Sequence, residues 1–423
     1  MAQINLSFEY YDTEQQCLFQ GFPNAKTLNK FVQNGMSISS DEFLAYMMFT
    51  EQMDRNGFRT YNDLQERIQK RLGDIDDYLT FNNGSVQARI IGNDMMQVGF
   101  TERIGVALGL CVVNKIHDLT AADWKKISTS PGRKGHPTFD FEISIASTGT
   151  NYIQVENKGS TITDNSVRNN SVQAHYTRIE NKKANVRKEE VNRQIPIHQK
   201  LFYGTIGVLD NRPNSIAKVW LVDPPAVDIE MNPEKYKLLA RLHYYLDEFR
   251  NIGVREKITK ALEKRIKLIE EAQNYLELDN KPLEGNFSKQ GAFYLYMDGK
   301  MFAAVNTNEA FGRIFIAEIK QRKLAYLIAF SKTIMRYIVK QDFKSILSYS
   351  YNPHFINESV QVLMRLGEKE NEETKLPVNL KFVFNERRKY FKATYFGKIR
   401  HSTDGRIFGL LNEEPIIVNE KSS

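Results

Sequence analysis

Two acidic side chains and one basic side chain fall on the polar faces of two neighbouring predicted strands. Residues 138–145 alternate between apolar and polar types, which predicts a strand with Asp140 on its polar face. Residues 152–158 alternate in the same way and place Glu156 and Lys158 together on one face. The bend STGTN joins the two runs and predicts an antiparallel hairpin, so the two carboxylates are expected within reach of one metal ion.

This combination suits the hydrolysis of a phosphodiester. Carboxylate oxygens are preferred ligands of Mg²⁺, and Mn²⁺ accepts the same ligands. The ammonium of Lys158 would orient an attacking water or stabilise charge on a phosphate. Glu102, in the helix predicted over residues 97–116, is a candidate third carboxylate for the metal.

The elements that must position these residues surround the hairpin in sequence. Residues 97–116 carry apolar side chains at spacings of three and four, which predicts a buried helix. After the hairpin, residues 172–193 are polar and rich in helix formers, and apolar runs at 201–209 and 217–222 predict two more strands. The order helix, hairpin, helix, strand, strand describes a compact α/β unit.

Together these motifs resemble the PD-(D/E)XK nuclease superfamily. The matching residues are Glu102 on the preceding helix, Asp140 at the end of PTFD, and Glu156 with Lys158 in VENK. The resemblance implies an α/β (α+β) fold with a restriction-endonuclease-like mixed sheet flanked by helices. It also implies Mg²⁺-dependent DNA cleavage with Asp140 and Glu156 as metal ligands and Lys158 near the nucleophilic water. The sequence departs from the family pattern in having Phe139 directly before Asp140.

The resemblance covers residues 91–225, about a third of the chain, and suggests four regions. Residues 1–90 are expected to form a mainly helical N-terminal accessory region, and residues 91–230 the nuclease-like core. Residues 231–282 are expected to form a helical bridge. Residues 283–423 are expected to form a mixed α/β domain for recognition or regulation.

Composition excludes several classes of protein. The chain has 423 residues, 41% hydrophobic and 26% charged, which excludes a disordered or collagen-like chain. Two cysteines, Cys17 and Cys111, are too few for a disulfide framework or a cysteine zinc site and indicate a reducing, cytoplasmic compartment. We expect no secretory signal and no membrane span. The sequence has no phosphate-binding Gly-x-x-x-x-Gly-Lys-Ser/Thr loop, and its histidines lack zinc-site spacing.

A formal net charge of +7 is compatible with a polyanionic partner, and two basic stretches could follow a DNA backbone. The first runs over 178–193, and the second over 381–400, where basic and aromatic residues interleave. The second stretch suits a half-buried strand equally well. The candidate nucleic-acid contacts are Arg178, Lys182, Lys183, Arg387, Arg388 and Lys389.

A second Glu-x-Lys motif, Glu318 to Lys320, serves as a control. The apolar residues that follow, from Leu324 to Ile334, have helical spacing. We therefore expect the motif to lie at the start of a helix, away from catalysis.

The leading hypothesis is a Mg²⁺-dependent DNA endonuclease that works, by analogy, in a restriction or anti-phage defence system. Cutting both strands most simply needs a homodimer, and a partner subunit is an alternative way to recruit or activate the chain. A non-cleaving nucleic-acid-binding or assembly subunit with a nuclease-like core remains open, as does an RNA-cutting enzyme on the same fold. Metal and phosphate chemistry is common to DNA and RNA, so the sequence does not separate these substrates.

Overall fold

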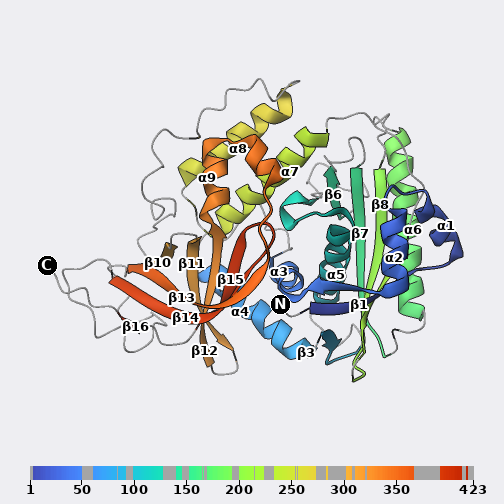
Figure 1. The fold of residues 1–423 in the computed structure, drawn as a ribbon, viewed down its shortest axis with the longest axis horizontal. Helices are drawn as coiled ribbons and strands as arrows, with labels where there is room; N and C mark the ends of the chain where they lie inside the picture. Colours follow the sequence, from blue (N-terminus) through green and yellow to red (C-terminus); the bar gives the residue numbers. More distant parts are fainter. Residues whose placement is uncertain are drawn as a thin grey trace. The chain divides into compact units, whose positions relative to one another are not determined.

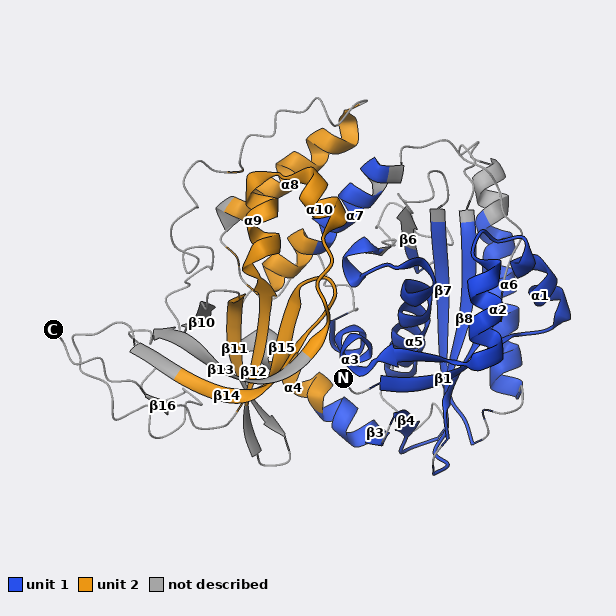
Figure 2. Cartoon of the chain, in the orientation of Figure 1, with its two compact units in different colours: residues 1–52, 73–244 blue, residues 53–72, 245–423 orange. Residues whose placement is uncertain are grey.

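A computed structural model shows two compact units in the chain, drawn in two colours in Figure 2: residues 1–52 with 73–244, and residues 53–72 with 245–423. Helices α4 (Tyr61–Tyr78) and α7 (Pro233–Asn251) each contribute residues to both units. The structure describes residues 3–49, 61–82, 84–91, 99–126, 140–144, 152–163, 165, 169–192, 200–213, 215–222, 233–252, 254, 256–272, 283, 302–306, 310–319, 322–365, 391–411 and 416–417.

The first unit is built around a mixed seven-stranded sheet with the strand order β2-β1-β9-β8-β7-β6-β5 (Figure 1). The β1–β9 and β7–β8 pairs are parallel, and the other neighbouring strands run antiparallel. Its strands are β1 (Gln3–Tyr10), β2 (Met36–Ser39), β5 (Lys125–Lys126), β6 (Phe141–Ser144), β7 (Tyr152–Thr161), β8 (Lys200–Leu209) and β9 (Ala217–Val222). A small separate hairpin consists of β3 (Leu79–Asn82) and β4 (Ser85–Ala88).

Each face of this sheet carries a helix and its own apolar core. The helices of the unit are α1 (Thr13–Gln20), α2 (Ala25–Asn34), α3 (Ser40–Phe49), α5 (Phe100–His117), α6 (Asn170–Asn192) and the 3-10 turn Ala121–Asp123. Ile104 of α5 shares one core with Val155 and Tyr203, and Ile179 of α6 shares the other with Phe202. Because successive strand residues point to opposite faces, Phe202 and Tyr203 place the two cores on opposite sides. The expected mixed sheet flanked by helices is confirmed.

Helix α5 lies unusually close to β7. A Cβ atom at Gly105 would lie 2.4 Å from the carbonyl carbon of Lys158, and a Cβ at Gly159 would lie 1.8 Å from the carbonyl oxygen of Thr101. Only glycine allows two backbones to approach this closely. The contact holds the first turn of α5, which carries Glu102, beside Lys158 and Gly159 in the second half of β7.

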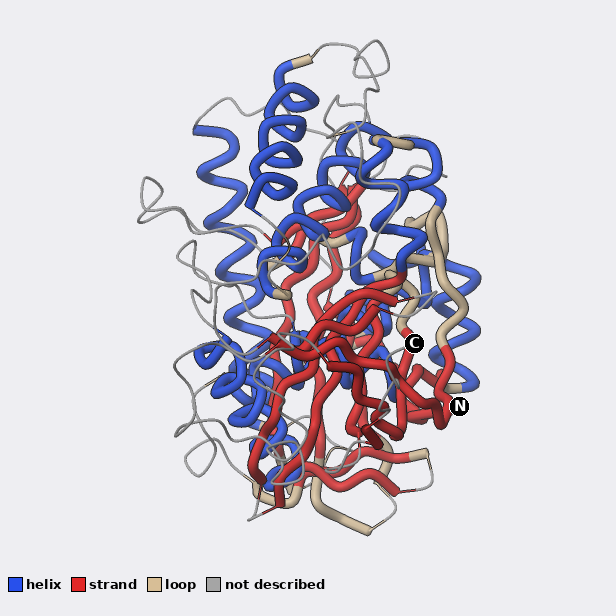
Figure 3. The backbone as a smooth tube through the Cα atoms, turned by 90° about the vertical axis from the view of Figure 1, so that its left-hand side faces the viewer, coloured by secondary structure: helices blue, strands red, loops and turns tan. Residues whose placement is uncertain are grey.

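The second unit contains a second sheet (Figure 1), and Figure 3 shows the helices and strands of the whole chain by colour. The sheet is antiparallel with the order β13-β10-β11-β12-β15-β14-β16, and a further β13–β14 pairing closes it on itself. Its strands are β10 (Phe302–Asn306), β11 (Ala310–Ile319), β12 (Arg322–Ser331), β13 (His354–Arg365), β14 (Phe391–His401), β15 (Arg406–Leu411) and β16 (Ile416–Ile417). The remaining helices are α8 (Glu256–Glu271), α9 (Lys332–Lys340) and α10 (Phe343–Ser348).

The boundary expected at residue 90 differs from the observed one. Strands β1 and β2, which lie within the expected accessory region 1–90, belong to the same sheet as the hairpin, and β1 pairs in parallel with β9. Ile4, Leu6 and Phe8 of β1 are buried in the core that α5 also fills. Parallel pairing between strands more than 200 positions apart leaves no local signal, so the sequence pattern did not show it.

The helix expected after the second Glu-x-Lys motif is wrong. Glu318 lies near the end of strand β11, and residues 322–331 form strand β12. Every residue from Ala325 to Phe330 is buried, so β12 is covered on both faces. A strand covered on both faces is a continuous apolar run, which periodicity cannot distinguish from a buried helix. The helix begins only at Lys332.

Candidate functional site

The predicted hairpin is confirmed, and it brings the two candidate metal ligands side by side. Strands β6 and β7 pair antiparallel with Phe141 opposite Val155, so the next position places Asp140 beside Glu156. The N–H of Asp140 donates to the carbonyl oxygen of Val155 at 3.1 Å. The N–H of Asn157 donates to Oδ2 of Asp140 at 2.9 Å, which fixes the carboxylate against β7.

The alternation predicted for β7 is also present. Ile153 and Val155 are fully buried in the core under α5. Gln154, Glu156 and Lys158 therefore point to the other face, where α6 packs. The side chain of Glu156 has 0% exposure and Lys158 has 24%, so a buried carboxylate lies next to a partly open ammonium.

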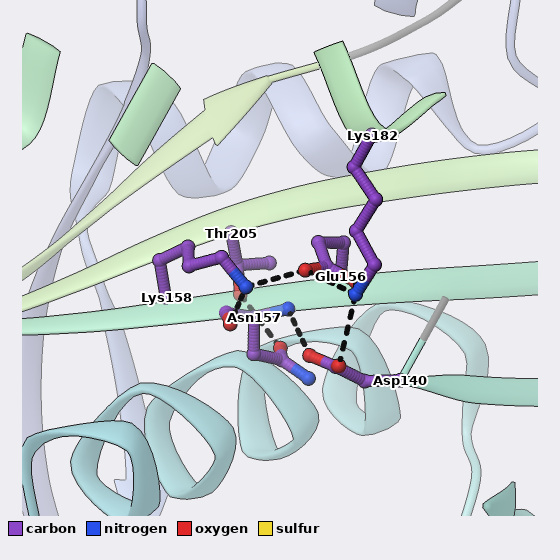
Figure 4. A network of polar contacts seen from close by, with 6 residues as sticks. All are labelled: Asp140, Glu156, Asn157, Lys158, Lys182 and Thr205. Carbon is purple, nitrogen blue, oxygen red and sulfur yellow. Dashed lines mark hydrogen bonds and ion pairs between the residues drawn. The ribbon is translucent and has the colours of Figure 1, made fainter. Parts of the chain in front are cut away.

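One lysine of α6 contacts both carboxylates, as Figure 4 shows. The Nζ atom of Lys182 lies 2.7 Å from Oε1 and 2.6 Å from Oε2 of Glu156, and 3.6 Å from Oδ1 of Asp140. Lys158 also donates to Oε1 of Glu156 and lies 3.3 Å from the carbonyl oxygen of Asn157. Two ammonium groups thus compensate two carboxylates, and one of them lies between the carboxylates.

The pattern of α6 explains why Lys182 reaches this place. Val172, Ile179 and Val186 recur every seven residues and are buried against the sheet. Lys182 follows Ile179 by three positions and precedes Val186 by four, so it belongs to the same inward stripe. Asn169 begins the helix by accepting the N–H of Val172 at 3.1 Å. Lys182 is predicted from the sequence as a contact to DNA, but its place inside an apolar stripe is a sequence signal of an internal partner.

Burial and charge shift the pKa values of the central pair. Burial raises the pKa of Glu156, and the neighbouring charge of Asp140 raises it further, while Lys158 and Lys182 act in the opposite direction. Burial alone would lower the pKa of Lys158, but the negative charges of Glu156, Asp140 and Glu102 outweigh it, so the net shift is upward. Lys158 therefore stays protonated, next to the Glu156 carboxylate, whose ionisation is disfavoured by burial.

Among the residues with described positions, no three or more His, Cys, Asp or Glu side chains form a group that could hold a metal ion. Glu102 is exposed on the first turn of α5, and its charge acts on Lys158 without completing such a group. The donor set is therefore Asp140 and Glu156. The ammonium of Lys182 contacts both carboxylates, so the two carboxylates lie close enough for a single cation to contact both. Mg²⁺ is commonly bound through one or two carboxylates and keeps several waters, so these residues fit it.

A second layer of polar contacts, which is not among the sequence-based predictions, supports the hairpin from the α5 side. Oδ1 of Asn157 accepts the hydroxyl of Thr205 on β8 at 2.7 Å. Within the described part of the chain, the buried Nδ2 atom of Asn157 has no hydrogen-bond partner. A Cβ at Gly109 would lie 2.0 Å from Oδ1 of Asn157. The spacing Gly105-x-x-x-Gly109 in α5 was the sequence signal of this close contact.

A further missed pair joins Ser160, two positions beyond Lys158 on the same face of β7, to His175 of α6. Nε2 of His175 is 3.2 Å from Oγ of Ser160, and both residues are buried. Burial lowers the pKa of His175 to about 4, and the positive charges of Arg178 and Lys158 act in the same direction. His175 is therefore a neutral group at the end of the polar row.

Apart from Lys182, the basic candidates separate into three groups. Arg178 is exposed on α6, so its contact with nucleic acid stays a prediction. Lys183 is only 5% exposed and lies over the ring of Phe202, 5.8 Å from its centre, so it offers little surface with which to contact DNA. The third group lies outside the described residues and consists of Arg387, Arg388 and Lys389.

The described end of the second basic stretch, residues 391–400, belongs to β14. Tyr395 and Ile399 are buried, whereas Phe396 and Lys398 are exposed. The half-buried strand is therefore confirmed for these residues.

The comparisons with known proteins add no relative. No family model, no curated protein and no solved structure matches the chain. Within the part of the chain that the structure describes, no helix is both long enough and apolar enough to cross a membrane.

Proposed function

We propose that the protein is a metal-dependent nuclease that hydrolyses phosphodiester bonds in DNA, with its site on the β6–β7 hairpin. The observation that carries this proposal is that the carboxylates of Asp140 and Glu156 contact one and the same ammonium, with Lys158 beside them. A restriction-endonuclease-like fold is part of the proposal. It is supported by the order of α5, the hairpin, α6 and β8, and by the mixed sheet between two helices.

In this proposal Asp140 and Glu156 hold Mg²⁺ or Mn²⁺, which would supply Lewis-acid stabilisation of charge on the phosphate. Asp140 is oriented for this by the N–H of Asn157. Lys158 keeps its proton, because the neighbouring carboxylates raise its pKa, so it serves as a fixed positive charge and not as a base. Its ammonium can neutralise negative charge that develops on the phosphate or hold the attacking water through a hydrogen bond.

The test is cleavage of plasmid and linear DNA by the purified chain with Mg²⁺, with Mn²⁺ and with a chelator. Glu156→Gln and Asp140→Asn remove one carboxylate charge each with little change of shape, and we expect each to lower cleavage at least roughly a hundredfold. Glu66→Gln is the matched control, because Glu66 is an exposed carboxylate of α4. Full cleavage by Glu156→Gln would contradict the proposal.

Absence of cleavage under every condition would favour the non-cleaving DNA-binding subunit instead. That alternative requires DNA binding that is independent of metal and unchanged in Asp140→Asn. RNA offered beside DNA in the same assay identifies the substrate class, because the metal and lysine chemistry would serve both.

A further inference from the structure

The ammonium of Lys182 lies where a metal ion would have to bind. It contacts both oxygens of Glu156, at 2.7 and 2.6 Å, and lies 3.6 Å from Oδ1 of Asp140. Lys158 contacts only one of the two carboxylates, that of Glu156. In Figure 4 Lys182 enters from α6 with its ammonium between the carboxylates, whereas Lys158 lies farther along β7.

We propose that Lys182 acts as an internal cation that closes the metal site, so that a divalent ion binds Asp140 and Glu156 only by displacing the ammonium. The inference rests on the proposed function because it assigns the two carboxylates to a metal. Lys182 is then a positioning residue that sets the metal affinity of the site.

Three features make displacement feasible. The Lys182 side chain is 28% exposed, so its ammonium can turn into water without being left buried and unpaired. Lys158 remains on Glu156 and continues to compensate part of its charge. Asp140 keeps its orientation, because its Oδ2 atom is held by a backbone N–H that does not depend on either lysine.

Lys158 provides a matched control for the charge effect. Both lysines contact Glu156, and their side chains are similarly exposed, 24% for Lys158 and 28% for Lys182. Lys158→Met and Lys182→Met therefore remove the same charge near the same carboxylate. Only Lys182→Met empties the place between Glu156 and Asp140.

The experiment measures binding of Mn²⁺ alone by electron paramagnetic resonance, without DNA and without a cleavage assay. We expect Lys182→Met to bind Mn²⁺ roughly tenfold more tightly than the wild type, a gain clearly larger than that of Lys158→Met. Adding Glu156→Gln to Lys182→Met should abolish the gain. Equal gains in the two lysine variants would reduce the effect to general electrostatics and overturn the proposal. Unchanged or weaker Mn²⁺ binding in Lys182→Met would also overturn it.

A measurement on the unmodified protein covers the case in which a variant does not fold. Mn²⁺ should increase the rate at which an amine-reactive reagent labels Lys182, read by mass spectrometry and normalised to the exposed Lys30. Labelling of Lys182 that does not rise when Mn²⁺ occupies the site would refute displacement. The two proposals fail separately: a chain that binds Mn²⁺ as described but never cuts nucleic acid would contradict only the nuclease.

Discussion

Replacing Gly109 by alanine is expected to destabilise the protein, although alanine is the better helix former. A Cβ at this position would lie 2.0 Å from Oδ1 of Asn157 and 2.2 Å from Oγ1 of Thr205. Real Cβ atoms essentially never approach another atom so closely, so both side chains must move. They are joined by a buried hydrogen bond of 2.7 Å, which the movement would strain or break.

The size of the effect follows from three contributions. Inserting a methyl group into a packed interior costs about 1–3 kcal/mol. Weakening the buried Thr205–Asn157 hydrogen bond adds about 1 kcal/mol. The higher helix propensity of alanine stabilises the helix by about 1 kcal/mol and offsets part of this cost. The net expectation is a loss of roughly 2 kcal/mol in the free energy of unfolding.

Gly73→Ala is the matched control, since Gly73 lies inside α4 and a Cβ there meets nothing within 4 Å. The same chemical change should therefore stabilise the protein by about 0.5–1 kcal/mol at this position. Urea unfolding followed by circular dichroism measures both variants, with linear extrapolation to water. A Gly109→Ala protein as stable as the wild type, or both variants shifting in the same direction, would refute the close contact between α5 and β7.

Three further predictions concern the first unit. Burial lowers the pKa of His117 from 6.5 to about 4. Its contribution to the free energy of unfolding is therefore complete above about pH 6.5. This contribution is lost as the pH falls toward about 4, by up to about 1.4 kcal/mol per pH unit. Urea unfolding at about pH 7.5 and about pH 5 measures this slope, which should be smaller in His117→Gln. Arg241→Met leaves the fully buried Asp123 without its closest cation and should cost roughly 3 kcal/mol; a change below the error of the unfolding assay would contradict this. Thr205→Val removes the donor to Asn157 and should cost about 1–3 kcal/mol, and a thermal midpoint equal to that of the wild type would speak against it.

Local patterns predicted the elements around the site well. The helix expected over 97–116 is α5 (Phe100–His117), and the strands expected at 201–209 and 217–222 are β8 and β9. The apolar residues of α5 recur at helical spacing, and the two strands are short apolar runs with turn residues between them, so short-range information is sufficient. The hairpin was predictable for the same reason, because a bend joins two alternating runs.

The interactions that shape the site were less predictable. The pairing of β1 with β9 and the contact of Lys182 with Glu156 join segments that are distant in sequence. A glycine inside a helix normally only weakens it, whereas Gly109 is the point at which α5 meets the side chain of Asn157. Periodicity tells which face of an element is buried but not which element covers it, and the role of a glycine or a lysine depends on that neighbour.

The charge balance of the site links the proposed metal to the proposed displacement. Asp140 and Glu156 carry two negative charges, and Lys158 and Lys182 carry two positive charges, so the four groups are neutral together. A divalent cation added to this arrangement would leave an excess of two positive charges around the fully buried Glu156 side chain. Turning the Lys182 ammonium into water removes one of them, and a phosphodiester, which carries one negative charge, removes the other. The metal and the DNA are therefore expected to bind cooperatively, each tightening the other, because either one alone leaves a net charge at a site that is neutral without it.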